Sequence, residues 1–322
     1  MRPGIQEKGG PAERTEREPQ MRTGDITGTG NIRIGISGWT YAPWRGAFYP
    51  RGLPRKRELA HAARTFRSIE INGTFYGLQT PDIFARWADE TPDDFVFAVK
   101  APRFMTHIKR LREPEVPLAN FLASGVLRLG GKLGPILWQL PPSLAFDPEV
   151  LEAFLAVLPH DGAAAAERAK RHDDHLKAPA WLQAEPGLRL RHALEIRHDS
   201  FVVPAFVEML RRHGVALVCA DTVEWPRLMD VTADFVYCRL HGSEELYRSG
   251  YKAEALDRWA KRVRAWSEGV PAEDGRFAAP APAKPVPRDV FFFFDNTDKL
   301  RAPEDARALM ERLGQPVVPQ EA

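Results

Sequence analysis

Ionisable side chains stand at the ends of several short apolar segments in this chain. Glu195 and Arg197 are two residues apart, and so are Arg239 and His241. Side chains with this spacing share one face of a β-strand. A charge at the end of a buried strand is costly unless it is paired or functional. The pattern therefore predicts a crowded polar site at the point where the strands end.

The candidate site combines acidic and basic side chains in nearly equal number. The charged residues at the expected strand ends are Glu70, Lys100, Glu195, Arg197, Asp221, Arg239 and Asp295. Four negative charges thus face three positive ones, and the charge of His241 is adjustable near neutral pH. Buried ion pairs contribute little to stability. Seven converging charges therefore favour a functional site over a structural plug of ion pairs.

Two chemistries fit these residue types, and the first is acid–base catalysis on a small polar or anionic substrate. In this interpretation Lys100, Arg197 and Arg239 hold a carboxylate, a phosphate or a developing oxyanion. A carboxylate, Glu70 or Glu195, then works with His241 as base and acid. The predicted catalytic residues are Glu70, Lys100, Glu195, His241 and Asp295. Hydrolysis, lysis and isomerisation are all compatible with this set.

The second chemistry uses one or two divalent metal ions, as in barrel-type isomerases, phosphoesterases or endonucleases. The ligands would be Glu70, Glu195, Asp221, His241 and Asp295. Oxygen ligands with one histidine suit magnesium, manganese or zinc. Three fixed cations would compete with the metal for these carboxylates. The favoured interpretation therefore has no cofactor, and a divalent metal is the alternative.

Aromatic and polar side chains in the loops after the strands form a candidate binding surface. The predicted substrate-binding residues are Trp39, Tyr41, Asn72, His107, Arg197, His198, Asp221, Arg239, Tyr251 and Asn296. Aromatic rings in such a cleft can stack on a sugar or a base. The expected ligand is a small anionic or sugar-like molecule.

The elements that position these residues alternate between strand and helix patterns. Eight apolar segments that read as buried strands begin near Ile32, Ser68, Phe95, Leu133, His192, Ala216, Asp234 and Val290. Helical periodicity separates them at Arg57–Phe66, Pro81–Glu90, Leu118–Leu129, Pro148–Leu158, Val203–His213, Lys252–Ser267 and Glu304–Leu313. Such alternation predicts parallel pairing with right-handed crossovers. We expect a single-domain α/β fold, a closed (β/α)8 TIM barrel. An open doubly wound sheet is the alternative, weakened because no glycine-rich phosphate loop follows the first strand.

The barrel is expected to span residues 31–316, between a disordered leader (1–30) and a tail (317–322). The segment Thr222–Ala233 is too short for a full helix with its loops, which predicts a reduced crossover. Two stretches, near 160–188 and 268–289, have the composition of surface insertions. Each lies between a helix and the next strand, so both are expected on the face opposite the site.

The charge balance and the hydropathy of the chain limit the classes of function. The 322 residues include 45 basic and 43 acidic ones, a net charge of +2. This balance disfavours a dedicated nucleic-acid binder, which usually shows a basic excess, although nucleic-acid binding and non-catalytic small-molecule sensing remain alternatives. Without an apolar run of about 20 residues or a signal peptide, no membrane association and a cytoplasmic location are expected. The sequence does not indicate an oligomeric state.

Several motifs resemble the YecE-like proteins, the domain-of-unknown-function family 72. They are GISGWTYAPWRGAFYP (Gly35–Pro50), EINGTFY (Glu70–Tyr76), LWQLPPS (Leu137–Ser143), EIRHDSF (Glu195–Phe201), YCRLHG (Tyr237–Gly242) and FFDNT (Phe293–Thr297). The resemblance implies a TIM barrel whose mouth these motifs surround, and it assigns no reaction. Phe201 departs from the pattern, since the family usually has tryptophan there.

Overall fold

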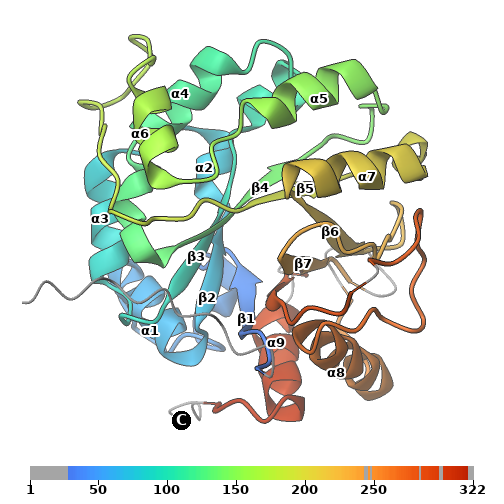
Figure 1. The fold of residues 1–322 in the computed structure, drawn as a ribbon. Coiled ribbons are helices and arrows are strands. Elements are labelled where there is room, and N and C mark those ends of the chain that lie inside the picture. The colour runs from blue at the N-terminus through green and yellow to red at the C-terminus, as the bar shows by residue number, and fades with distance from the viewer. Residues whose placement is uncertain (1–27, 243–245, 247–248, 283, 297–299, 318–322) are drawn as a thin grey trace, which may run out of the picture.

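Eight parallel strands close into a barrel in the order β1 to β8, with β8 paired to β1 (Figure 1). The computed structural model describes residues 28–242, 246, 249–282, 284–296 and 300–317. The strands are β1 (Ile32–Ser37), β2 (Ser68–Ile71), β3 (Val96–Lys100), β4 (Leu133–Gln139), β5 (His192–Glu195), β6 (Ala216–Asp221), β7 (Phe235–Leu240) and β8 (Asp289–Phe294). The expected closed barrel is confirmed, and each strand begins within one residue of its predicted start.

Helices surround the barrel on its outside (Figure 1). They are α1 (Glu58–Thr65), α2 (Gly73–Tyr76), α3 (Pro81–Asp89), α4 (Glu115–Ala123), α5 (Pro148–Ala156), α6 (Gly162–Ala169), α7 (Pro204–His213), α8 (Ala253–Ser267) and α9 (Arg301–Arg312). The predicted helix Leu118–Leu129 is interrupted. Gly125 has φ 111° and packs against Pro81, where a Cβ would lie 2.4 Å from the Pro81 Cα. A left-handed residue ends α4 there, and a 3-10 segment, η4 (Val126–Lys132), follows.

The alternation of side chains along each strand divides the core into two layers. One side of each strand points into the barrel, where Ala98, Leu137, Val218, Tyr237 and Phe293 pack together. The other side points toward the helices and forms the larger outer core. This arrangement explains why the strands read as continuous apolar runs, since both of their faces are buried. It also means that a shift of one residue decides whether a side chain enters the barrel.

The segment near 160–188 differs from the expected surface loop. It contains α6, whose Ala165 and Ala169 are buried. Farther along, the Asp173 carboxylate accepts a hydrogen bond from Asn120 of α4. Residues Asp173 and His175 share a cavity with α2 and with the loop after β3. Part of this segment therefore lies beside the barrel mouth, and not on the opposite face.

The segment near 268–289 covers the crossover between β6 and β7. Residues 222–234 lie entirely within the described chain and contain no helix, as expected. The buried Asp230 carboxylate accepts hydrogen bonds of 2.9 Å from the backbone N–H groups of Ala278 and Ala279. Met229 N–H also donates to the carbonyl of Arg276. The alanine- and proline-rich segment thus takes the place of the missing helix.

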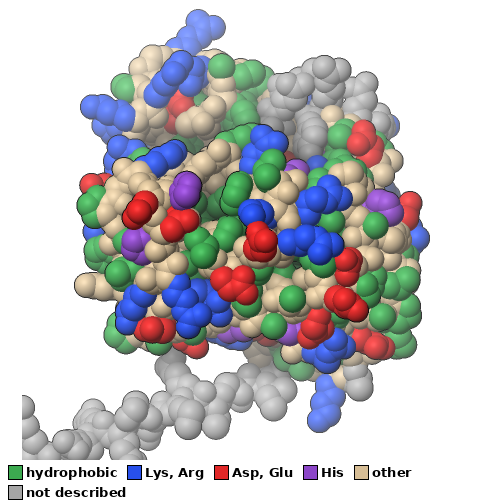
Figure 2. All heavy atoms as spheres, turned by 90° about the horizontal axis from the view of Figure 1, so that it is seen from above, with side chains coloured by type: hydrophobic (Ala, Val, Ile, Leu, Met, Phe, Trp, Pro, Cys, Tyr) green, Lys and Arg blue, Asp and Glu red, His purple; other side chains and the backbone are tan. Residues whose placement is uncertain are grey.

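The surface carries mixed charges. On the face drawn in Figure 2, basic and acidic side chains are intermingled, with hydrophobic side chains exposed between them. None of the described helices is long and apolar enough to cross a membrane. The predicted leader falls largely on residues 1–27, and most of the predicted tail on residues 318–322, which lie outside the described part of the chain.

Candidate functional site

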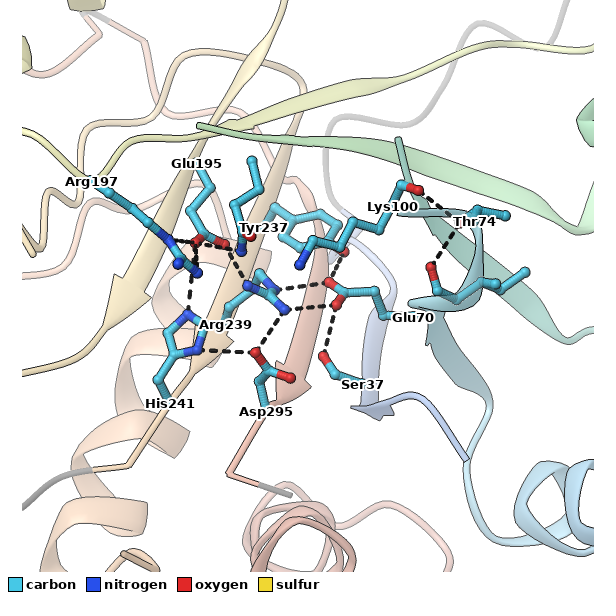
Figure 3. Close-up of polar contacts among 12 residues, drawn as sticks. Ser37, Glu70, Thr74, Lys100, Glu195, Arg197, Tyr237, Arg239, His241 and Asp295 are labelled. Atoms are coloured by element: carbon cyan, nitrogen blue, oxygen red, sulfur yellow. Dashed lines mark hydrogen bonds and ion pairs between the residues drawn. The ribbon is translucent and has the colours of Figure 1, made fainter. Parts of the chain in front are cut away.

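The guanidinium group of Arg239 lies inside the barrel, near the carboxyl ends of the strands, where three carboxylates hold it (Figure 3). Its Nε and one terminal nitrogen each donate to Glu70 at 2.9 Å. The other terminal nitrogen donates to Glu195 at 2.6 Å, and Asp295 accepts a further bond at 2.8 Å. Arg239, Glu70 and Glu195 are fully buried. Such a fork of charge-assisted hydrogen bonds fixes all four side chains.

Further donors saturate the two glutamates. Glu70 accepts hydrogen bonds from the hydroxyl groups of Ser37, at 2.8 Å, and Tyr237, at 2.6 Å. Glu195 accepts from Arg197 at 2.8 Å and from the amide of Gln139 at 2.9 Å. Burial raises the pKa of Glu195, but the charges of Arg239 and Arg197 outweigh burial and hold it well below the usual value. Both glutamates are thereby engaged on every side by protein donors.

His241 and Asp295 form the part of the cluster nearest the last strand. The Nδ1 of His241 lies 3.1 Å from the Asp295 carboxylate, and its Nε2 lies 4.0 Å from Glu195. Burial raises the pKa of Asp295, yet Arg239 and His241 bring it down to about 2. Asp295 therefore carries a full negative charge at neutral pH. Unlike the two glutamates, it borders the cleft above the barrel.

Lys100, at the end of β3, approaches this cluster without joining it. Among the described residues it forms no ion pair, and its ammonium lies 4.2 Å from the centre of the Phe75 ring. Its backbone carbonyl accepts a hydrogen bond from Thr74, which anchors the strand end. Burial and the nearby charge of Arg239 lower the pKa of Lys100 to about 8. Lys100 thus has an ammonium group that borders the cleft and is not saturated by carboxylates.

A large cleft of about 1340 Å³ opens above the barrel, over the ends of β1 to β5 and β8. Its lining includes Lys100, Arg197, Gln139, Asn72 and Asp295. The basic residues of the lining are Arg55, Lys56, Arg57, Arg86, Lys100, Arg103 and Arg197, while the acidic ones are Glu90 and Asp295. Seven basic against two acidic residues give the cleft a positive field, which attracts anions. The balanced charge of the whole chain therefore conceals a local basic excess.

Aromatic rings form much of the wall of this cleft. Trp39 packs edge-to-face on Trp87, with ring centres 5.4 Å apart. The Tyr41 hydroxyl donates to the carbonyl of Ser37, so its ring covers the end of β1. Near Lys100, burial together with the charges of Lys100 and Arg197 lowers the pKa of His107 to about 4. His107 is therefore neutral at pH 7 and can donate or accept a hydrogen bond without adding charge.

The structure brings together most of the predicted site residues. Glu70, Glu195, Arg239, His241 and Asp295 share one cluster, and Lys100 approaches it. Trp39, Tyr41, Asn72, His107 and Arg197 line the cleft above. Glu70, Glu195, Arg239 and His241 are fully buried and do not border the cleft. The predicted set thus divides into a buried framework and an accessible wall.

Four predicted substrate-binding residues lie elsewhere, which corrects their expected position. Asp221 is one residue out of phase with Val218 and Ala220, which face the barrel interior. Its side chain points outward and pairs with Arg227 at 2.6 Å. Tyr251 borders the same outer cavity as Asp221.

The remaining two corrected residues have local structural contacts. His198 accepts a hydrogen bond from the backbone N–H of Ser200 and caps a short 3-10 helix. Asn296 is buried and donates to Asp305 and to the carbonyl of Ser249. With Asp221 outside, three carboxylates face Arg239, Arg197 and Lys100, so the cluster is more evenly balanced than predicted.

Several residues of the site were not predicted. They include Ser37, Gln139 and Tyr237, each of which donates a hydrogen bond to a buried glutamate. Strand parity could have identified Tyr237, because it lies two residues before Arg239. Trp225, on the β6–β7 loop, stacks on Arg197 with 3.7 Å between the guanidinium carbon and the ring centre. Nothing in the loop sequence signals that contact.

Arginine side chains engage the carboxylates that were predicted as metal ligands. Glu70, Glu195 and Asp295 all accept hydrogen bonds from Arg239, and Asp221 lies outside the cluster. In the described part of the chain, no group of three or more His, Cys, Asp or Glu side chains is placed to hold a metal ion. No cofactor is indicated by these residues.

This protein is thus a closed (β/α)8 barrel with a charged cluster at the carboxyl ends of its strands. The family described as "Protein of unknown function DUF72" matches residues 33–322. The chain belongs to this family.

Relatives of this chain include bacterial proteins of the same family. The chain is 28% identical over 243 residues to the UPF0759 protein YecE of Escherichia coli O157:H7, covering 74% of this chain and 82% of the relative. It is 30% identical over 122 residues to the UPF0759 protein YunF of Bacillus subtilis, covering 34% of this chain and 40% of that protein. A DUF72 family protein from Thermotoga maritima has a similar structure, with a TM-score of 0.66, 24% identity and coverage of 88% of this chain and 100% of that one.

Proposed function

We propose that this protein is an enzyme that performs acid–base chemistry on a small anionic substrate in the cleft, with Lys100 as the proton-transfer residue. The observation that carries the proposal is the position of the Lys100 ammonium. It borders the cleft beside the buried cluster and, among the described residues, has no carboxylate partner. Structural lysines in a protein interior are normally paired. A group that stays available in such a place is a candidate for chemistry.

The electrostatics of the site support this role. With a pKa of about 8, Lys100 populates both its charged and its neutral form near neutral pH. General acids and bases work best when their pKa lies near the operating pH. The neutral amine is also a nucleophile, so the same residue could add to a carbonyl group of the substrate. Both roles require the proton equilibrium that burial and Arg239 impose.

The neighbours of Lys100 supply binding and orientation. Arg197 borders the cleft, and Glu195 and Trp225 hold its guanidinium in place. A fixed guanidinium suits a phosphate or carboxylate group. Arg239, Glu70 and Glu195 act as a positioning framework in this proposal, since they are saturated and buried. In this proposal, the two glutamates and His241 position other side chains, whereas the sequence predicted that they transfer protons.

The first test is the protonation of Lys100 itself. Competitive labelling with trace acetic anhydride over pH 6 to 11, followed by peptide mass spectrometry, gives the titration midpoint of each lysine. We expect a midpoint near 8 for Lys100 and protection of Lys100 by millimolar phosphate or citrate. The fully exposed Lys261 is the internal control, with an ordinary or higher midpoint. A Lys100 midpoint above 10 would overturn the proposal.

The second test is turnover. Phosphorylated and carboxylated metabolites that raise the thermal midpoint of the protein are followed by NMR for conversion. Lys100→Met and Lys100→Arg are expected to lower turnover at least 100-fold, because arginine keeps the charge but cannot release its proton. Lys261→Met should match the unmodified protein. Turnover by Lys100→Arg at the original rate would remove Lys100 from the reaction.

Binding of single-stranded nucleic acid is a second candidate function, favoured by the seven basic residues and the tryptophans of the cleft. Cations that follow a backbone and rings that stack on bases are typical of such sites. Fluorescence anisotropy with labelled oligonucleotides of DNA and RNA separates the two functions. A dissociation constant that rises steeply with salt would favour this candidate. No binding at 50 mM salt would exclude it.

A further inference from the structure

A second cavity, of about 500 Å³, lies next to the cleft and has a different chemical character. Its wall is formed by α2, by the residues after β3 and by the start of α4. Its lining combines the apolar side chains of Leu78, Pro102, Phe104, Met105, Val116 and Pro117, which give most of the exposed area, with the polar side chains of Arg103, Lys109, Glu113, Glu115, Asn120, Asp173 and His175. Phe104 and Val116 are 49% and 43% exposed, although they are large and hydrophobic. Exposed apolar side chains gathered around one cavity are typical of a binding site.

The two cavities adjoin each other and have lining residues in common. Phe75, Tyr76 and Arg103 line both of them. Phe75 also contacts the Lys100 ammonium and lies 5.1 Å from the His107 ring, measured between ring centres. Tyr76, which lines both cavities, is 77% exposed. A ligand held near Lys100 therefore has an apolar compartment beside it, on the far side of Phe75.

The backbone that forms this wall is unusual. Residues Phe104–Ile108 form a single π-helical turn directly after β3. Three residues that follow, Arg110, Leu111 and Glu113, adopt positive φ angles of 51°, 67° and 48°. Such conformations are disfavoured for residues other than glycine and cluster at ligand sites, and π-helical turns are frequent at functional sites. The segment that includes part of this wall therefore adopts backbone conformations that its residues disfavour on their own.

We propose that the substrate is amphipathic, with an anionic head beside Lys100 and Arg197 and an alkyl or aryl group in the second cavity. The charges of the cleft match the head, and the apolar lining of the second cavity matches the tail. The inference rests on the proposed function, because it places the head at the same site. It adds the substrate class, an acyl, alkyl or aryl phosphate or carboxylate, which the cleft alone does not specify.

The test uses butyl, hexyl, octyl and decyl phosphate below their micellar concentrations, with binding measured by isothermal titration calorimetry. Burying one methylene group contributes about 0.8 kcal/mol, so the affinity should rise about three- to fourfold for each added methylene until the cavity is full. Val116→Asp places a charge in the second cavity and should remove this dependence on chain length. Val270→Asp, at an equally exposed valine on another part of the surface, is the matched control and should keep it.

A chain-length dependence that Val116→Asp abolishes and Val270→Asp retains supports the inference. Affinities that are equal across the series, or an unchanged dependence in Val116→Asp, overturn it. The proposed function fails separately, because its tests are the protonation and turnover of Lys100. Head-group binding is checked with Arg197→Met, which should weaken every member of the series by the same factor.

Discussion

Two neighbouring regions of the barrel mouth use the same residue types in opposite ways. Around Arg239, the two glutamates are fully buried and saturated by donors, and Asp295 pairs with Arg239 and His241. Around Lys100, the cation borders a cleft and has an aromatic ring as its neighbour. Saturated charges fix a geometry, whereas unsaturated charges remain available to a ligand. Charge density alone therefore does not locate chemistry, whereas the pairing of each charge does.

The largest expected effect comes from breaking the saturated region. Arg239→Met leaves Glu70, Glu195 and Asp295 buried without their common partner. Removing one partner of a buried ionic network costs about 3–5 kcal/mol, and urea unfolding should show a loss in this range. Arg189→Met is the control, because its pair with Asp234 is largely exposed and worth about 1 kcal/mol or less. Equal losses in the two variants would contradict the framework role of Arg239.

Removing the charge of the unsaturated region should stabilise the protein, in contrast to the loss expected for Arg239→Met. The pKa of Lys100 in the folded protein, about 8, lies below its ordinary value of 10.5. Between these two pH values the unfolded chain therefore binds more protons than the folded protein. The charged form of Lys100 thus opposes folding. Lys100→Met should therefore raise the free energy of unfolding at pH 7, by on the order of 1–3 kcal/mol. The free energy of unfolding of the unmodified protein should rise between pH 8 and 10.5, so that its difference from Lys100→Met becomes smaller. Urea titrations at pH 7, 9 and 10.5 check this; a destabilised Lys100→Met would place lysine in the framework.

The two regions should also communicate through charge. The negative charge of Asp295 raises the pKa of Lys100 and partly offsets burial and Arg239. Asp295→Asn should therefore move the labelling midpoint of Lys100 below 8. Circular dichroism verifies that the variant is folded, with Glu70 and Glu195 still holding Arg239. An unchanged midpoint would mean that the regions are electrically independent.

The smallest effect is expected outside both regions. Asp221 points away from the barrel and pairs with the half-exposed Arg227. Asp221→Asn should leave the labelling midpoint of Lys100 and the affinity for butyl phosphate unchanged, with a stability loss of about 1 kcal/mol. Competitive labelling, calorimetry and urea unfolding measure the three quantities. A change in anion affinity would return Asp221 to the site.

Much of the fold follows from local sequence pattern. Strands buried on both faces give continuous apolar runs, so their positions were readable, and their charged ends indicated the correct edge of the barrel. Parity within a strand was also readable where two polar residues repeat, as in Arg239 and His241. Parity also places Asp221 outside the barrel, because its neighbour Ala220 occupies the inward position.

Other features depend on contacts that no local pattern contains. The helix predicted over Leu118–Leu129 breaks because Gly125 meets Pro81, about 44 positions away in sequence. The distinction between saturated and available charges is likewise set by distances across the barrel. Glu70 and Lys100 both lie in short apolar strands. Only the tertiary structure shows that donors surround the Glu70 carboxylate, whereas the Lys100 ammonium has no carboxylate partner among the described residues.

The crossover between β6 and β7 has a consequence for the order of folding. Its covering segment is made about 50 residues later, since Asp230 is satisfied by Ala278 and Ala279. Leu228 and Met229, buried in the finished protein, therefore emerge from the ribosome before their cover exists. The carbonyl of Ile32, in the first strand, likewise accepts a hydrogen bond from Gln315, which is made 283 residues later. This architecture leaves apolar surface uncovered during synthesis, a period in which chaperones bind nascent chains.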